Sequence, residues 1–280
     1  MKLYKYVNEE RIDIIQNCKI RFSSPLSLND PFELKPNVTE LSSEQKLLQD
    51  FEPMLTKTII EEYSKQTNKT SLNETLRIFQ SITPDLKNQF PQLVKKNIPA
   101  IKLMLHRALA KSIGMLCLSE NPINLLMWAH YANSHRGFVI EFEPTSKFFN
   151  KANDDPTNFQ RLHKVKYVEE MPRFTLETMG NFDPFIHKSI DWFYEQEWRM
   201  LLPLASANTV TGDGPLAIHL FNLPKSSITG ILLGAMATKE TETTIVDLIN
   251  ANHNFKHVKL YKAFIDDQNY KLNIYPLLPN

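Results

Sequence analysis

The sequence is poor in glycine and cysteine, and it lacks any long apolar run. Only 7 of the 280 residues are glycine, and neither a P-loop nor a GxGxxG run is present to bind phosphates. Cys18 and Cys117 are the only cysteines. Two thiols do not make a disulfide framework, so we expect both to be buried and reduced, with no redox role. No stretch approaches the roughly 18 apolar residues of a membrane span, so we expect a soluble, cytoplasmic protein with no membrane partner.

The chain also lacks an excess of basic over acidic residues, or of acidic over basic ones. Lys and Arg together number 32 and Asp and Glu number 31, which gives a formal net charge of +1. This balance provides no global attraction to nucleic acid or to a membrane surface, although it is compatible with a local basic groove. Hydrophobic residues make up 42% of the chain, which is enough for a sizeable core.

Short apolar segments between turn residues predict an α+β fold with mixed or antiparallel sheets of short strands. Strands are expected at residues 3–7, 20–22, 114–118, 137–142, 162–168, 196–202, 216–220, 228–233, 258–263 and 272–275. Helices are expected at residues 8–17, 122–133, 182–192 and 238–252, the last with Ile245, Leu248 and Ile249 facing inward.

The segment from about residue 40 to 110 has a different character. Apolar residues recur at helical spacing between residues 47 and 60, and further helices are expected at residues 71–82 and 92–111. We interpret this segment as a helical insertion between two parts of the sheet, within one α+β domain that spans residues 1–280.

Three separated segments carry polar residues at the ends of predicted elements, and together they predict a polar cleft. In the first, a strand with Arg21 runs into Ser23 and Ser24, and Asn29 and Asp30 follow. Hydroxyls and backbone N–H groups at the end of a strand are suited to holding a ligand. The same residue types also form structured turns by bonding their own backbone, so this alternative stays open.

The second segment is the expected helix with Trp128, His130 and Tyr131. Trp128 and Tyr131 are spaced i, i+3 and share one helical face. Such an aromatic pair can sandwich a flat ring such as nicotinamide or adenine, and His130 can reach polar groups in a cleft. Core packing of the two aromatic side chains is the alternative, and the sequence favours it for these aromatics taken alone.

The third segment is the sequence EQEWR. Side chains alternate along a strand, so Glu195, Glu197 and Arg199 are predicted to share one face. Arg199 beside a carboxylate would lower the pKa of that carboxylate and keep it ionised. An ionised carboxylate is suited to stabilising a positive charge or to accepting a hydrogen bond from a ribose hydroxyl. The alternative is a structural row of ion pairs on one face of the sheet.

Metal binding has less support. The histidines show neither HxxxH nor HExxH spacing, and no second cysteine lies near either thiol. A carboxylate site for Mg²⁺ stays open as an alternative, because acidic oxygens are the ligands that this ion prefers. Its ligands would be Asp30, Glu33, Glu195 and Glu197.

These segments resemble a family of mainly bacterial proteins, the domain of unknown function 2971. The resemblance rests on LYKY, RFSSPLSLNDPFE, LCLSENPINLLMWAHYANSHRGFVIEF, WFYEQEWR with the preceding Lys188, and ILLG. It spans most of the chain outside the helical insertion. The family name itself implies no activity.

The order of the parts is also similar to that of ADP-ribosyltransferase folds, including toxins that modify DNA. That resemblance implies that NAD is the substrate, that Glu197 is the catalytic carboxylate and that Glu195 is its accessory, as in the E-x-E motif of arginine-modifying relatives. The first strand has Lys5 where such enzymes have Arg or His, and the chain has SSP in place of an STS-type motif. The residues expected to hold NAD are Lys5, Arg21, Ser23, Ser24, Asn29, Asp30, Trp128, His130, Tyr131 and Arg199.

Three functions therefore stand as hypotheses. The first is an NAD-consuming ADP-ribosyltransferase or NAD glycohydrolase, acting as a bacterial toxin or phage-defence effector on a protein or nucleic acid, with an antitoxin or defence partner. The second is a non-catalytic module that binds a nucleotide or a peptide in the same cleft. The third is a metal-dependent nuclease that uses the clustered carboxylates.

Overall fold

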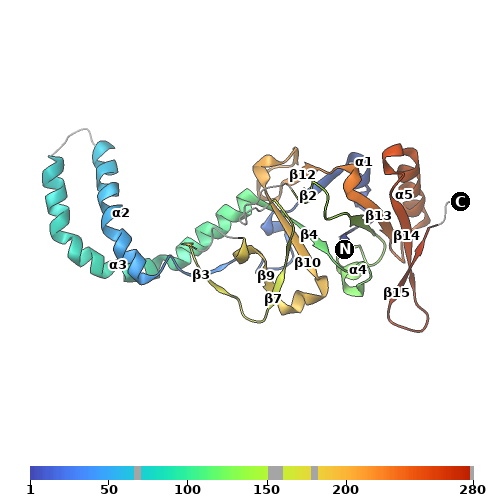
Figure 1. The fold of residues 1–280 in the computed structure, drawn as a ribbon, viewed down its shortest axis with the longest axis horizontal. Coiled ribbons are helices and arrows are strands. Elements are labelled where there is room, and N and C mark those ends of the chain that lie inside the picture. The colour runs from blue at the N-terminus through green and yellow to red at the C-terminus, as the bar shows by residue number, and fades with distance from the viewer. Residues whose placement is uncertain (66–70, 151–159, 178–181, 278–280) are drawn as a thin grey trace. The chain divides into compact units, whose positions relative to one another are not determined.

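The computed structural model describes residues 1–65, 71–150, 160–177 and 182–277 (Figure 1). The fold is mixed α+β, as the sequence predicts. The chain divides into two compact units, which are described separately here. Unit 1 comprises residues 1–34, 108–171 and 185–280, and unit 2 comprises residues 35–107 and 172–184.

Unit 1 is built on a sheet of eight strands in the order β15-β14-β13-β5-β1-β4-β10-β6. The pair β13 and β14 is parallel, and the other neighbours are antiparallel. The strands are β1 (Leu3–Val7), β4 (Ile113–Ser119), β5 (Phe138–Phe142), β6 (His163–Lys164), β10 (Glu197–Pro203), β13 (Ile228–Leu233), β14 (Lys259–Ile265) and β15 (Leu272–Pro276).

The core of unit 1 lies where this sheet meets helix α5 (Lys239–Ala251) and the N-terminal helical turns. Those turns are η1 (Glu9–Ile12) and α1 (Asp13–Asn17). Ile245 and Ile249 of α5 are buried as predicted, and Leu248 packs against the same cluster while partly exposed. Thr238 begins α5 by accepting a hydrogen bond from the backbone N–H of Thr241, which satisfies one of the free donors at a helix start.

The sheet is open between β1 and β4, and this opening positions the site described below. Strand β1 pairs with β5 at five positions, whereas it pairs with β4 only at Tyr4 and Ser119. Farther along, the ammonium of Lys5 donates to the carbonyl oxygen of Cys117 at 3.1 Å. On its other side β4 is fully paired with β10 from Ser119 to Ile113, so the opening is confined to the β1 side.

The remaining strands form three smaller sheets. One in unit 1 has the order β11-β12-β2, another in unit 1 pairs β7 with β9, and one in unit 2 pairs β3 with β8; the last two are parallel. The strands are β2 (Lys19–Phe22), β3 (Asn37–Glu40), β7 (Lys166–Val168), β8 (Arg173–Thr175), β9 (His187–Ser189), β11 (Thr209–Thr211) and β12 (Ile218–Asn222). Directly after β2, Ser23 forms an isolated antiparallel bridge with Met115 of β4.

Two predicted elements of unit 1 are wrong. The helix expected at residues 182–192 is replaced by η4 (Asp183–Phe185), strand β9 and η5 (Ile190–Glu195). The backbone of β9 pairs with β7, and this long-range pairing overrides the local helical pattern. The strand expected at residues 162–168 is divided at Val165, because β6 pairs with β10 whereas β7 pairs with β9.

The helical insertion forms α2 (Glu44–Lys65) and α3 (Leu72–Ser112), and α3 replaces the two separate helices predicted there. Pro84, Pro91 and Pro99 lie inside α3. They are seven and eight residues apart, so they fall near one helical face, where each removes a backbone donor. Figure 1 shows that the helix curves along this stretch rather than ending. Within unit 2, the rings of Phe51 and Phe90 meet at a centroid distance of 4.8 Å.

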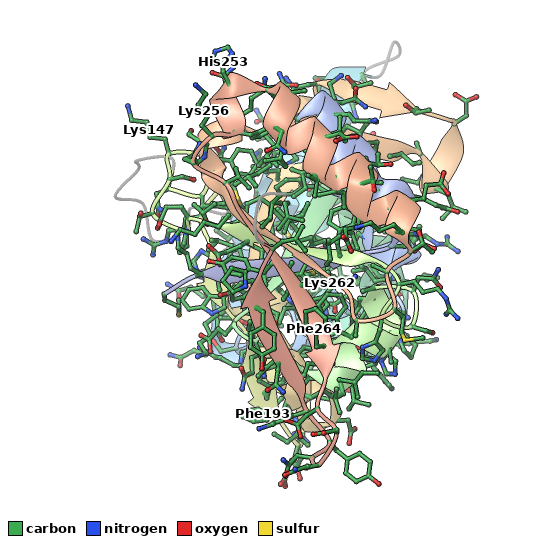
Figure 2. The ribbon with its side chains drawn as sticks, turned by 90° about the vertical axis from the view of Figure 1, so that its right-hand side faces the viewer. Lys147, Phe193, His253, Lys256, Lys262 and Phe264 are labelled. Atoms are coloured by element: carbon green, nitrogen blue, oxygen red, sulfur yellow. The ribbon has the colours of Figure 1, made fainter. Side chains whose placement is uncertain are left out.

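A lysine of strand β14 is paired with helix α5 in unit 1. Figure 2 shows Lys262 and Phe264 on β14, below α5. The ammonium of Lys262 lies 2.6 Å from a carboxylate oxygen of Glu242 on α5 and 6.0 Å from the ring centroid of Phe264. Within the described residues, no helix is long and apolar enough to cross a membrane.

Gly137 gives a test of how tightly β1 and β5 are joined. A Cβ atom at Gly137 would lie 2.1 Å from the carbonyl oxygen of Val7. Gly137→Ala should therefore lower the free energy of unfolding by about 1–3 kcal/mol, the usual cost of overpacking. Gly230→Ala is the matched control, because its nearest atom would lie at 3.3 Å. Equal urea midpoints for the two variants would contradict this packing.

Candidate active site between strands β1 and β4

The opening between β1 and β4 is a cavity of about 310 Å³. All three polar segments singled out from the sequence reach it. The sequence-predicted residues that line it are Lys5, Ser23, Asn29, His130, Tyr131, Glu195 and Glu197. The structure therefore brings together, in unit 1, residues that are up to 192 positions apart in the chain.

Glu197 is the most strongly bonded acid of the site. Arg199 donates from Nε to Oε1 at 2.8 Å and from Nη2 to Oε2 at 3.1 Å, and Lys188 donates to Oε2 at 3.1 Å. Burial would raise the pKa of Glu197, but Arg199 and then Lys188 lower it by more, and the thiol of Cys117 adds a hydrogen bond. The pKa of Glu197 therefore lies below its ordinary value, and the carboxylate is ionised.

Glu195 reaches the same cavity from outside the strand. It ends η5, and Gln196 then turns the chain with a positive φ of 44°. The hydroxyl of Ser119 fixes this turn by donating to the carbonyl oxygen of Glu195 at 2.6 Å. The prediction that Glu197 and Arg199 share a strand face is confirmed by their hydrogen bonds, whereas the prediction that Glu195 continues the same strand is wrong.

The two carboxylate oxygens of Glu195 have different partners. Tyr131 donates its hydroxyl to Oε1 at 2.6 Å, and Lys188 donates to Oε2 at 2.5 Å. Burial raises the pKa of Glu195 above its ordinary value, and the charge of Glu197 adds to this effect, while Lys188 opposes it. The site thus holds two acids whose pKa values are displaced in opposite directions, a pattern typical of functional sites.

Arg199 lies behind the cavity wall and joins it to the first polar segment. The side chain is fully buried. Its Nη1 and Nη2 donate to the two oxygens of Glu33 at 2.7 and 2.9 Å, and Nη1 also donates to the carbonyl of Phe185. Such a bidentate pair fixes geometry as well as charge. Arg199 is therefore placed to hold Glu33 and Glu197, rather than to contact a ligand.

Lys188 belongs to the candidate site, although the sequence analysis named it only as part of the family resemblance. It is the buried middle residue of β9 and bridges Glu195 and Glu197. Its ammonium also lies 4.8 Å from the ring centroid of Trp192. No spacing rule identifies it, because a lysine within a segment of helical pattern suggests an exposed position. The one useful signal is the excess of acidic over basic side chains in the predicted cleft, because buried acids need a further cation.

Lys5 and Cys117 face each other across the opening. Burial lowers the pKa of Lys5, and its one hydrogen bond to a described residue is the one to Cys117. An ammonium has three donors, so capacity remains for a ligand. Both cysteines are free thiols, and each is partly exposed rather than buried as predicted. The exposed part of Cys117 lines the cavity. The removal of its thiol from bulk water raises its pKa.

The rim of the cavity is polar. Asn29 donates from Nδ2 to the hydroxyl oxygen of Tyr131 at 3.0 Å. His130 shares a hydrogen bond of 3.1 Å between its Nδ1 and the hydroxyl of Tyr194. The turn before β3 and helix α4 (Leu125–Tyr131) are thereby tied together at the entrance. Helix α4 starts at Asn124, whose side chain accepts from the N–H groups of Leu126 and Met127.

Besides Arg199, four of the residues predicted to hold NAD lie away from the cavity lining. Trp128 is fully buried, bonds to the carbonyl of Pro122 and packs edge-on against Tyr6, so it does not sandwich a ring with Tyr131. Ser24 bonds to the carbonyl of Ala110. Asp30 accepts from the N–H of Phe32 to form a turn. Arg21 lies on β2 and is not among the lining residues, so the turn and core alternatives hold for these positions.

The proposed carboxylate site for Mg²⁺ has no support in this geometry. Glu33, Glu195 and Glu197 each bind a cationic side chain of the chain itself. Among the residues that the structure describes, no group of three or more His, Cys, Asp or Glu is placed to hold a metal ion. A divalent ion would also lie beside Lys188 and Arg199, where like charges repel.

Comparison with known proteins gives one match. Residues 127–200 match the family described as "Protein of unknown function (DUF2971)". The match runs from α4 to β10 and includes Tyr131, Lys188, Glu195, Glu197 and Arg199, and it supports the resemblance seen in the sequence over these residues. No curated protein and no solved structure matches the chain.

Arg199→Met tests how much the buried ion pairs of Arg199 contribute to the free energy of unfolding. The change leaves Glu33 and Glu197 buried without their guanidinium, so it should lower the free energy of unfolding by about 3–5 kcal/mol. Lys164→Met is the control, because Lys164 pairs with Glu120 through a side chain that is 56% exposed, and it should cost less than about 1 kcal/mol. Urea denaturation measures both, and similar losses would contradict the assignment.

The lowered pKa of Glu197 predicts a specific acid sensitivity. A carboxylate with a pKa lowered by folding stabilises the fold above its unfolded pKa of roughly 4.3, and this contribution is lost as the pH falls toward the folded value. The free energy of unfolding should therefore fall less between about pH 6 and pH 3 for Glu197→Gln than for the unaltered chain. Equal losses in the two chains would show that Glu197 has an ordinary pKa.

Proposed function

We propose that the cavity binds the nicotinamide–ribose half of NAD, and that the chain cleaves the bond between nicotinamide and ribose. The protein would then be an ADP-ribosyltransferase-like enzyme or an NAD glycohydrolase. The observation that supports this proposal is that Ser23, Tyr131 and Glu197, from three distant segments, line one cavity. The resemblance to ADP-ribosyltransferases had assigned the nicotinamide half and the catalytic carboxylate to these segments.

The chemistry needs a negative charge at a fixed position. As nicotinamide leaves, positive charge develops on the ribose, and a preorganised carboxylate beside it lowers the barrier. The lowered pKa of Glu197 keeps that carboxylate ionised. Arg199 and Lys188 hold it in place, so it does not have to reorganise during the reaction.

Other groups of the cavity are suited to holding the substrate. The free donors of Lys5 fit a phosphate oxygen or the carboxamide oxygen of nicotinamide. The lining rings of Tyr4, Tyr6 and Tyr131 provide aromatic surface in place of the buried Trp128. A volume of about 310 Å³ is at the small end of ligand sites, which suits half of NAD inside and the adenosine half outside.

A non-catalytic binding module is the second candidate, and one observation favours it. All four carboxylate oxygens of Glu195 and Glu197 already accept a hydrogen bond from the chain. The network would then be structural, and the same cavity would hold a nucleotide without cleaving it. Binding of NAD seen by calorimetry, with no release of nicotinamide, would support this candidate over the enzyme.

The biological setting is proposed on the resemblances alone. ADP-ribosylating toxins and defence effectors act on a protein or a nucleic acid, and an antitoxin or defence partner restrains some of them. A bacterial role of this kind is therefore proposed for this chain, with its macromolecular target unidentified.

Release of nicotinamide from NAD is the test. Glu197→Gln should lower the rate by about 100-fold or more, since it removes the charge that stabilises the transition state. The fold should survive, because the amide oxygen of the glutamine can still accept a hydrogen bond from Arg199 or Lys188. Glu143→Gln is the control, as Glu143 pairs with Lys2 on the surface, and it should release nicotinamide at the unaltered rate.

Circular dichroism and thermal melting establish that each variant is folded. The unaltered protein is assayed with NAD alone and with candidate protein and nucleic-acid targets. If it releases no nicotinamide under any of these conditions, the enzymatic proposal is wrong.

A further inference from the structure

We infer that the acceptor of the ADP-ribosyl group at this site is an uncharged nucleophile, such as water or a hydroxyl group, and not the guanidinium of an arginine. The inference rests on the proposed cleavage of NAD. It departs from the expectation attached to the E-x-E motif, whose relatives modify arginine. The basis is the position of Lys188 between the two glutamates of that motif.

A guanidinium binds a carboxylate best through two parallel hydrogen bonds, which require both oxygens to be open on one side. Glu195 can offer this arrangement only beside a cation of the chain itself. Its Oε1 accepts from Tyr131 at 2.6 Å and its Oε2 accepts from Lys188 at 2.5 Å. Each oxygen keeps one further acceptor position, but a guanidinium that used both would lie against the ammonium of Lys188.

Glu197 has less room, because its Oε2 already accepts two hydrogen bonds from the chain. Its Oε2 accepts from Lys188 at 3.1 Å, and Arg199 bonds to both of its oxygens. The side chain of Lys188 is only 6% exposed and its ammonium also lies against the ring of Trp192 at 4.8 Å. Because packing and two acids hold Lys188, moving it aside would leave a buried cation without partners.

The positive charges already present in the cavity also disfavour an arginine acceptor. Lys188 is already the cation shared by Glu195 and Glu197, and Lys5 supplies a further ammonium in the same cavity. A guanidinium entering here would approach Lys188 and gain no free carboxylate in return, so repulsion would dominate.

An uncharged hydroxyl meets neither obstacle. Each carboxylate oxygen accepts two hydrogen bonds, so one further donor still fits on Oε1 or Oε2 of Glu195. A water molecule or a single hydroxyl needs only that one position. Glu195 is therefore placed to orient a neutral nucleophile, while Lys188 acts as a positioning residue that excludes cations.

The reaction balances without any redox partner. The bond between ribose C1′ and the nicotinamide nitrogen breaks, and its electron pair leaves with nicotinamide. A bond forms between C1′ and the oxygen of water, and one proton passes to solvent. The products are nicotinamide, ADP-ribose and a proton.

The experiment compares two small acceptors in reactions of the unaltered protein with NAD, followed by mass spectrometry. Agmatine carries a guanidinium, and methanol carries a neutral hydroxyl. We expect nicotinamide, ADP-ribose and some methyl ADP-ribose, with the agmatine adduct at least about 100-fold less abundant than ADP-ribose. An agmatine adduct as a major product would overturn the inference while leaving the cleavage of NAD intact.

Two variants test whether it is the ammonium of Lys188 that excludes the guanidinium. Lys188→Met removes the shared cation and frees Oε2 of Glu195, so it should raise the share of the agmatine adduct at least about 10-fold. Tyr131→Phe opens Oε1 of Glu195 but keeps the ammonium, so the adduct should stay at the background level. If Lys188→Met is unfolded, the result for the unaltered protein still decides. If the unaltered protein releases no nicotinamide with any acceptor, the proposed function fails, and this inference falls with it.

Discussion

The site depends on one buried set of ion pairs in which Arg199 and Lys188 join three carboxylates. Arg199 binds Glu33 and Glu197, and Lys188 binds Glu197 and Glu195. Charges removed from water are costly unless they are paired and hydrogen-bonded. The partners come from the turn with Glu33, from strand β9 with Lys188 and from the EQEWR segment, so the folded state must bring all three together before the charges are satisfied. This requirement fixes the wall of the cavity in one arrangement.

The opening of the sheet makes room for this arrangement. Strand β10 supplies Glu197 and Arg199 while fully paired with β4, and β1 leaves β4 after a single pair of residues. A continuous sheet would have placed backbone hydrogen bonds where the cavity now lies. The ammonium of Lys5 bonds to a carbonyl of β4 in this opening. The fold therefore exposes charged side chains to a ligand without exposing them to bulk solvent.

The sequence predicts much of the fold because its signals are local. Strands such as β1 and β13 and the caps of α5 follow from short apolar patterns and capping residues. It fails at β9, where the pairing with β7 depends on a distant partner. The same limit applies to the site. Strand alternation places Glu197 beside Arg199, and the preference of tryptophan for the core agrees with the buried position of Trp128. Nothing local predicts that Lys188 would bridge both glutamates.

The central claim is that nicotinamide and ribose occupy the cavity beside Glu197. A crystal structure of Glu197→Gln with NAD tests it most directly, since we expect that change to slow cleavage and preserve the substrate. The account predicts the nicotinamide ribose between Tyr131 and residue 197, with the phosphates toward Lys5. A structure in which NAD is absent from this cavity at saturating concentration, or is bound elsewhere on the chain, would contradict it.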